Sequence, residues 1–203
     1  EKYDIPLIDD EVVCGFGRTG NLWGAETFGM KPASITVAKA LSSSYLPISA
    51  VIVADEYYEI IAKKSNELGI FGHGYTYSGH PVGAAVAIET IRIIEQDKIL
   101  DHVKDVSKFF RIKLMELSKT NAVLNIRSVG LMGAFELAAS NAGYSEKPVG
   151  GGAGDKLVDL AQKHCLFIRA IGNTIVLAPP LIISKREINI LFERLTNAIG
   201  EWQ

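Results

Sequence analysis

The sequence has 203 residues, of which 48% are apolar and 22% are charged. This composition is that of an ordinary globular protein, and it excludes collagen-like, coiled-coil and largely disordered chains. The 21 basic and 23 acidic residues give a formal charge of −2. Because no excess of positive charge is available to hold a polyanion, nucleic acid is not an expected partner.

Three apolar runs in the first part of the chain have the length and β-branched content of strands. They are Ile5 to Asp9, Ile35 to Ala38 and Ile48 to Ala54. Because these runs show little alternation with polar residues, we predict buried, parallel strands. Asp55 is the expected N-cap of a helix over Glu56 to Lys64. Pro81 is placed in the first turn of a longer helix that runs to about Gln96.

The second part of the chain has a different pattern. A long amphipathic helix is predicted from about Asp97, followed by strands near 123–129 and 131–138. A glycine-rich loop at 150–154 precedes the remaining predicted elements: a helix over Asp155 to His164, strands over Leu166 to Arg169 and Thr174 to Ala178, and a helix after Ser184. We therefore predict two domains, residues 1–97 with an α/β pattern and residues 98–203 with an α+β pattern.

Metal and membrane sites are not indicated. Cys14 and Cys165 lie in opposite halves, and the four histidines form no metal-ligand spacing. The longest apolar stretches, such as the run at 175–183, are too short to cross a bilayer, which needs roughly 20 residues. The first residues do not resemble a signal peptide, so we expect a cytoplasmic protein.

The segment GFGRTG at 15–20 matches the glycine spacing of a dinucleotide-binding turn. That pattern requires a helix to begin at the third glycine, but no amphipathic helix begins at 21–24. Asp9, Asp10 and Glu11 directly before the segment would also repel a pyrophosphate. We therefore predict a tight loop here rather than a dinucleotide site.

Three other features are weak when each is taken alone. Asp10 and Lys39 each follow a predicted strand, where α/β sheets bind ligands, but both residue types are also common on surfaces. Thr76 and Ser78 precede the helix at Pro81, where hydroxyls and free N–H groups favour an anion or simply cap the helix.

Taken together and in order, these segments resemble a known family. DDEVVCGFGRTG, ITVAKALSSSYLPISAV and GHGYTYSGHPVGAA are similar to consecutive blocks of the class III aminotransferases, pyridoxal-phosphate enzymes of fold type I. The resemblance covers residues 5–90 with high specificity, and it continues more loosely through FIRAIGNTIVLAPPL at 167–181.

The resemblance implies a role for each matching residue. Lys39 would form a Schiff base with pyridoxal phosphate, and Asp10 would pair with the pyridine nitrogen. Val12 would pack on one face of the ring. Thr76, with the backbone of Tyr75, would contact the cofactor phosphate of the neighbouring subunit in a homodimer.

The resemblance also implies an activity. The protein would move an amino group from an amine or ω-amino acid donor to a keto acid such as pyruvate, as in the ω-amine:pyruvate branch. Arg169 would bind the carboxylate of the acceptor, a task that suits a planar guanidinium. Residues 1–97 would be the second half of the cofactor-binding large domain, and residues 98–203 the small domain. Asp9 would point away from the site, because side chains alternate along a strand.

Family members are considerably longer, so the chain resembles their C-terminal half. The N-terminal half supplies a glycine and serine loop for the cofactor phosphate and an aromatic ring that stacks on the pyridine. Two alternatives remain open at this stage. One is another pyridoxal-phosphate reaction, such as that of an aminomutase or decarboxylase. The other is an inactive fragment that acts as a binding or interaction module.

Overall fold

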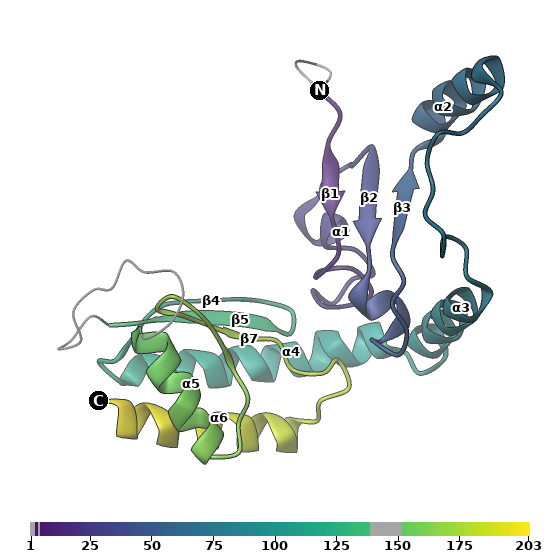
Figure 1. Ribbon diagram of the computed structural model, residues 1–203. Coiled ribbons are helices and arrows are strands. Elements are labelled where there is room, and N and C mark those ends of the chain that lie inside the picture. The colour runs from purple at the N-terminus through teal and green to yellow at the C-terminus, as the bar shows by residue number, and fades with distance from the viewer. Residues whose placement is uncertain (1–2, 4, 139–151) are drawn as a thin grey trace. The chain divides into compact units, whose positions relative to one another are not determined.

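The computed structural model describes residues 3, 5–138 and 152–203. The chain forms two compact units, Glu1–Leu100 and Asp101–Gln203. Each unit has its own sheet and its own helices (Figure 1). Assignment of these units to the large and small domains of an aminotransferase remains a prediction.

The first unit contains a sheet of three short strands in the order β1, β2, β3. They are β1 (Ile8–Asp10), β2 (Ser34–Val37) and β3 (Ala50–Val53). β1 and β2 are parallel, as predicted, with Asp10 opposite Thr36. β2 and β3 are antiparallel, with Thr36 opposite Val51.

The antiparallel pairing corrects the prediction that all three strands are parallel. A parallel return needs a crossover connection, usually a helix that traverses the sheet. The segment between β2 and β3 contains only the short 3-10 helix η1 (Lys39–Ser42). The chain therefore turns back and pairs β3 in the opposite direction.

The expected burial of these strands is also wrong for this chain. Ile8 in β1 is 70% exposed and Val51 in β3 is 63% exposed, whereas Val37 in β2 is buried. The described helices of the first unit leave much of the apolar surface of β1 and β3 uncovered. Continuous apolar runs indicate strands that are buried on both faces. Within this chain only part of the sheet is buried.

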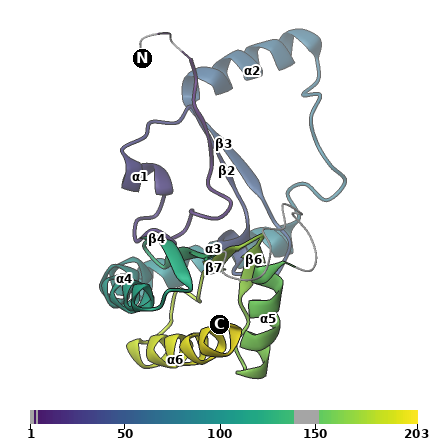
Figure 2. The ribbon, with the colours of Figure 1, turned by 90° about the vertical axis from the view of Figure 1, so that its left-hand side faces the viewer.

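Three α-helices belong to the first unit: α1 (Gly24–Phe28), α2 (Asp55–Leu68) and α3 (Pro81–Gln96). α3 has the predicted bounds, with Pro81 at its first position. α2 is longer than predicted and has Ala54, not Asp55, as its N-cap. The Asp55 carboxylate, in the first turn, still has a favourable position relative to the helix dipole. α1 lies to one side of the strands in Figure 2.

The second unit is an antiparallel sheet packed against helices. The sheet order is β4, β5, β7, β6. Its elements in chain order are α4 (Ile99–Glu116), η2 (Leu117–Lys119), β4 (Val123–Val129), β5 (Met132–Leu137), α5 (Ala153–Lys163), β6 (Arg169–Ile171), β7 (Thr174–Leu177) and α6 (Lys185–Trp202). α5 and α6 lie beside each other in both views (Figures 1 and 2).

The core of the second unit is formed by buried side chains of its strands and its helices. Alternate residues of β5, including Phe135 and Leu137, are buried, as expected for a sheet with one covered face. Phe110 of α4 packs against Phe192 of α6 with ring centroids 5.5 Å apart. Gly133 of β5 permits a close approach of α4, because a Cβ at Gly133 would lie 2.7 Å from Leu114 Cδ2.

The β6 strand is shifted from its predicted position. A turn at Gly172 and Asn173 joins β6 to β7 and pairs Ile171 with Thr174. Gly172 has a φ of 58°, which a glycine adopts without strain. Because the turn sets the register, Arg169 begins the strand instead of ending it, and Leu166 lies before it.

The other predicted elements of the second part match closely, and α6 begins after Ser184 as expected. The Ser184 hydroxyl accepts the Glu187 N–H at 3.2 Å, and the Glu187 carboxylate accepts the Ser184 N–H at 2.8 Å. This reciprocal arrangement is a capping box. Gly150 and Gly151 of the predicted loop lie outside the described residues.

Gly154 of α5 provides a direct test of packing in the second unit. A Cβ at this position would lie 2.1 Å from the Gly172 carbonyl oxygen and 2.8 Å from Ala170 Cβ. We expect Gly154→Ala to lower the free energy of unfolding by about 1–3 kcal/mol because the backbone must move. Urea denaturation would measure this loss.

Gly200 of α6 supplies the matched control. No atom lies within 4 Å of a Cβ at Gly200, so Gly200→Ala should raise stability by up to about 1 kcal/mol through helix propensity. Equal effects of the two substitutions would contradict the close contact between α5 and the β6–β7 turn.

Candidate functional site

Asp10 and Lys39 lie at the same edge of the first sheet. Asp10 is the last residue of β1, and Lys39 follows β2 by two positions. Because the two strands are parallel neighbours, their carboxyl ends meet at one edge (Figure 1). Both side chains are exposed in this chain. The structure therefore places the two residues that the sequence singled out at one edge of the sheet.

The Asp10 carboxylate is held by two donors on one of its oxygens. The Val12 N–H donates to Asp10 Oδ1 at 3.0 Å. The Thr36 hydroxyl donates to the same oxygen at 3.3 Å. Within the described residues, Asp10 Oδ2 accepts no hydrogen bond. One oxygen is thus fixed by the protein, and the other remains available to a ligand.

The Lys39 backbone has an unusual conformation. Its φ is 43°, in the left-handed region that non-glycine residues rarely adopt, and Ser43 in the same turn has a φ of 49°. The turn is held by the buried Ser42, whose hydroxyl donates to the Leu46 carbonyl oxygen at 2.6 Å. Such conformations are typical of functional sites, where surrounding contacts maintain them.

Glu11 organises the loop at 15–20 and was not singled out by the sequence. Its side chain is 1% exposed, and Oε1 accepts the Ala25 N–H at 2.7 Å. The Glu11 carbonyl oxygen accepts the Gly15 N–H at 2.8 Å. A Cβ at Gly24 would lie 3.1 Å from Glu11 Oε2. Glu11 therefore links the start of the loop at Gly15 to the residues that follow the loop at 24–25. The prediction of a tight loop with no helix at the third glycine, Gly20, is confirmed. The expectation that no helix begins at 21–24 is wrong, because the five-residue helix α1 begins at Gly24.

Asp9 lies on the side of β1 that carries Glu11. Asp9 Oδ2 is shielded from solvent and accepts no hydrogen bond from the described residues. Burial, then interaction with Glu11 and the charge of Asp10, raises the pKa of Asp9 above its ordinary value. Asp9 is less exposed than Asp10, as expected from alternation along the strand.

The raised pKa of Asp9 gives stability a defined pH dependence. The folded state holds the Asp9 proton to higher pH than the unfolded state, so this group lowers stability as pH rises from about 4. We expect Asp9→Asn to be more stable than the parent protein at pH 8, with the difference vanishing near pH 4. Thermal unfolding at the two pH values would measure it. A variant less stable than the parent at pH 8 would contradict the cost of this charge.

Tyr75 and Thr76 lie in the exposed connection between α2 and α3. The Tyr75 N–H donates to the Ser78 hydroxyl oxygen at 3.0 Å. The Tyr75 and His73 rings meet edge to face with centroids 5.6 Å apart. Both contacts join residues of this connection to each other. Among the residues that the structure describes, no hydrogen bond or ion pair joins Thr76 to Asp10 or Lys39, and its role toward another subunit stays a prediction.

Arg169 is the first residue of β6, and its side chain is exposed. It lies opposite Val176 of β7. Its guanidinium makes no ion pair with any residue that the structure describes. Phe167, two residues earlier, is 87% exposed. Arg169 is therefore available to an anionic ligand, although its use as a carboxylate receptor stays a prediction.

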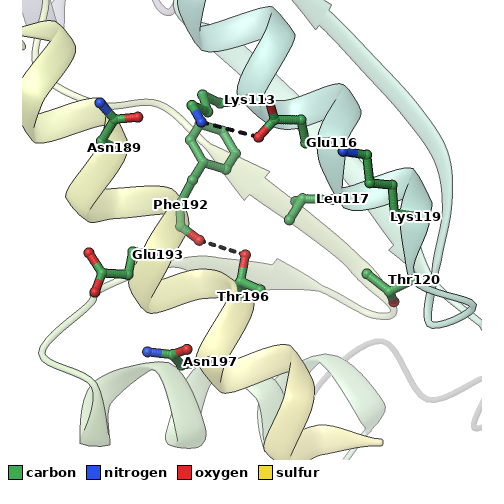
Figure 3. Close-up of a pocket in the computed structure, with 10 residues that line it drawn as sticks. All are labelled: Lys113, Glu116, Leu117, Lys119, Thr120, Asn189, Phe192, Glu193, Thr196 and Asn197. Atoms are coloured by element: carbon green, nitrogen blue, oxygen red, sulfur yellow. Dashed lines mark hydrogen bonds and ion pairs between the residues drawn. The ribbon is translucent and has the colours of Figure 1, made fainter.

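A shallow groove of about 580 Å³ lies on the second unit (Figure 3). The end of α4 and η2 form one of its sides, and α6 forms the other. It mixes both charges: Lys113 and Glu116 pair within it at 3.2 Å, and Lys119 and Glu193 also line it. None of the predicted site residues lines this groove. Among residues 3, 5–138 and 152–203, no cluster of three metal-ligating side chains occurs.

No helix in the described part of the chain combines the length and apolar character needed to span a membrane.

Comparison with known proteins identifies relatives along nearly the whole chain. The family model described as Aminotransferase class-III matches residues 1–199. Gamma aminobutyrate transaminase 3, chloroplastic, of Solanum lycopersicum is 40% identical over 201 residues, covering 99% of this chain and 39% of the relative. Probable gamma-aminobutyrate transaminase 4 of Oryza sativa subsp. japonica is 38% identical over 202 residues, covering 99% and 41%.

Solved structures give the same result. The omega transaminase from Pseudomonas jessenii in complex with PMP matches with a TM-score of 0.92 at 39% identity, covering 99% of this chain and 44% of that chain. A transaminase with L-ala matches with a TM-score of 0.92 at 40% identity, covering 98% and 47%. The predicted α/β fold class is confirmed. The chain spans about two fifths of the length of the curated relatives it matches. It belongs to the class III aminotransferase family.

Proposed function

We propose that the protein is a pyridoxal-phosphate-dependent aminotransferase that moves an amino group from an amine or ω-amino acid to a keto acid such as pyruvate. The observation that carries the proposal is the position of Asp10 and Lys39 at the carboxyl ends of adjacent parallel strands. Family membership supports it. The names of the relatives, gamma aminobutyrate transaminases and omega transaminases, support an ω-amino donor.

The donor set at this edge fits pyridoxal phosphate. The cofactor offers an aldehyde for a primary amine and a ring nitrogen for an anion. Lys39 supplies an exposed amine, and Asp10 an exposed carboxylate whose Oδ1 is already held by the Val12 N–H. When bound, pyridoxal phosphate would supply an electron sink for negative charge on the carbon that bears the substrate nitrogen.

Each residue then has a task. Lys39 would hold the cofactor through Nζ and, once released, would accept the proton from the donor carbon and deliver it again. Asp10 would hold a proton on the ring nitrogen, and Val12 would pack against the ring. Tyr75 and Thr76 would bind the cofactor phosphate of a partner subunit in a homodimer.

Titration of the complete protein with pyridoxal phosphate, followed by amines and pyruvate, tests the proposal. We expect a visible absorbance band that an amine discharges and pyruvate restores, with formation of alanine. Decarboxylated or rearranged products would indicate another reaction of the same cofactor. Absence of the band would favour a binding or interaction module. Sedimentation would test the homodimer, and cell fractionation would test the proposed cytoplasmic localisation.

Arg169 would bind the acceptor carboxylate. We expect Arg169→Ala to slow the half-reaction with pyruvate about 10- to 100-fold, because a charge-assisted bond is lost. The half-reaction with an uncharged amine should change much less. Single-turnover absorbance measurements would separate the two half-reactions.

Arg111→Ala is the matched control, because Arg111 is an exposed arginine of α4 and should leave both half-reactions unchanged. Equal losses in both half-reactions of Arg169→Ala would remove Arg169 from the carboxylate role.

A further inference from the structure

The Thr36 hydroxyl contacts the carboxylate that would bind the cofactor ring. Thr36 lies directly opposite Asp10 in the parallel pairing of β2 with β1. Its Oγ1 donates to Asp10 Oδ1 at 3.3 Å. The Val12 N–H donates to the same oxygen at 3.0 Å. Both donors therefore reach one oxygen of the carboxylate from two different segments of the chain.

The backbone around this contact is held by interactions other than the one between Thr36 and Asp10. The Glu11 N–H donates to the Thr36 carbonyl oxygen at 2.9 Å, which extends the pairing of the two strands past Asp10. Glu11 is in turn anchored by the Ala25 N–H at 2.7 Å. Val37, the next residue of β2, is buried. These contacts hold the strands in register, so the Thr36 hydroxyl is presented to Asp10 by a rigid frame.

We propose that Thr36 is a positioning residue, whose hydroxyl, together with the Val12 N–H, orients the Asp10 carboxylate so that Oδ2 is left for the cofactor ring nitrogen. This inference rests on the proposed function. A carboxylate with one oxygen held by two donors loses rotational freedom about its side-chain bonds before the ligand arrives, and such preorganisation strengthens binding. The strand itself does not require a hydroxyl here, because valine is an equally good strand former.

The position of Thr36 also links the two halves of the proposed site. Thr36 precedes Lys39 by three residues on the same segment, where β2 ends and η1 begins. One short segment would thus orient the acid and deliver the amine. A displacement of β2 would disturb both groups together.

Thr36→Val in the complete protein removes the hydroxyl and keeps the side-chain shape. We expect pyridoxal phosphate to bind about tenfold more weakly, the cost of one hydrogen bond to a charged group. Thr36→Ser should restore most of the affinity. The melting temperature of the cofactor-free protein should change little in either variant. Thr174→Val in β7 is the control, because Thr174 is a strand threonine of the other unit and should leave the affinity unchanged.

A double-mutant cycle with Asp10→Asn separates positioning from a general structural effect. If Thr36 acts through Asp10, Thr36→Val should cost far less affinity in the Asp10→Asn background than in the parent. Additive losses, or a Thr36→Val protein with parental affinity, would overturn the inference while leaving the proposed function intact. A parent protein that does not bind pyridoxal phosphate would overturn both.

Discussion

Lys39→Ala is expected to lower the rate of amino transfer at least about 10³-fold. The substitution removes the amine that would hold the cofactor and the base that would move the substrate proton, and each of these tasks is worth orders of magnitude. Alanine production from pyruvate and an amine would measure the loss. The folded structure should survive, because the Lys39 side chain is exposed.

Lys163→Ala is the matched control for this experiment. Lys163 is an exposed lysine at the end of α5, so its removal should leave the rate at the parental value. If Lys39→Ala exchanged amino groups as fast as the parent protein, Lys39 would not be the catalytic amine.

Asp10→Asn is expected to slow the half-reaction with an amine by about 10²- to 10³-fold. The amide keeps the size of the side chain but carries no negative charge, so it cannot stabilise a proton on the ring nitrogen. The magnitude is that of removing one preorganised electrostatic group from a catalytic site. Stopped-flow absorbance of the cofactor would follow the half-reaction.

Asp9→Asn makes the same chemical change one residue earlier. Along β1 the Asp9 side chain lies on the face that carries Glu11 and not on the face of Asp10, so this variant should keep the parental rate. Similar losses in the two variants would show that the total charge of β1, and not the Asp10 carboxylate, controls the reaction.

Elements with strong local signals were predictable from the sequence. α3 begins at Pro81 because proline suits the first helical position, and α6 begins after Ser184 because Ser184 and Glu187 form a capping box. The loop at 15–20 was predictable because no helical pattern begins at its third glycine, although the short helix α1 that begins at Gly24 was not predicted.

Features that depend on distant partners were not predictable in the same way. The direction of β3 depends on the connection after Lys39, and the start of β6 depends on the turn at Gly172. The apolar pattern of the sequence predicts neither the direction of β3 nor the start of β6. The surface exposure of β1 and β3 depends on which segments cover them, and the sequence of a strand does not contain that information.

Some residues of the candidate site were predictable from the sequence, and others were not. Asp10 and Lys39 were singled out because each follows an apolar run, and parallel pairing of those runs brings them to one edge. Glu11 and Thr36 were missed because their contacts depend on register. Once Asp10 is known to lie opposite Thr36, a hydroxyl three residues before Lys39 becomes a recognisable signal.

The most direct test of the central claim is to locate the covalent bond between the protein and its cofactor. The complete protein would be loaded with pyridoxal phosphate, reduced with borohydride, digested and examined by mass spectrometry. We expect the reduced cofactor on the peptide that contains Lys39, and its loss in Lys39→Ala. Stoichiometric modification of a different lysine, with Lys39 unmodified, would contradict the account.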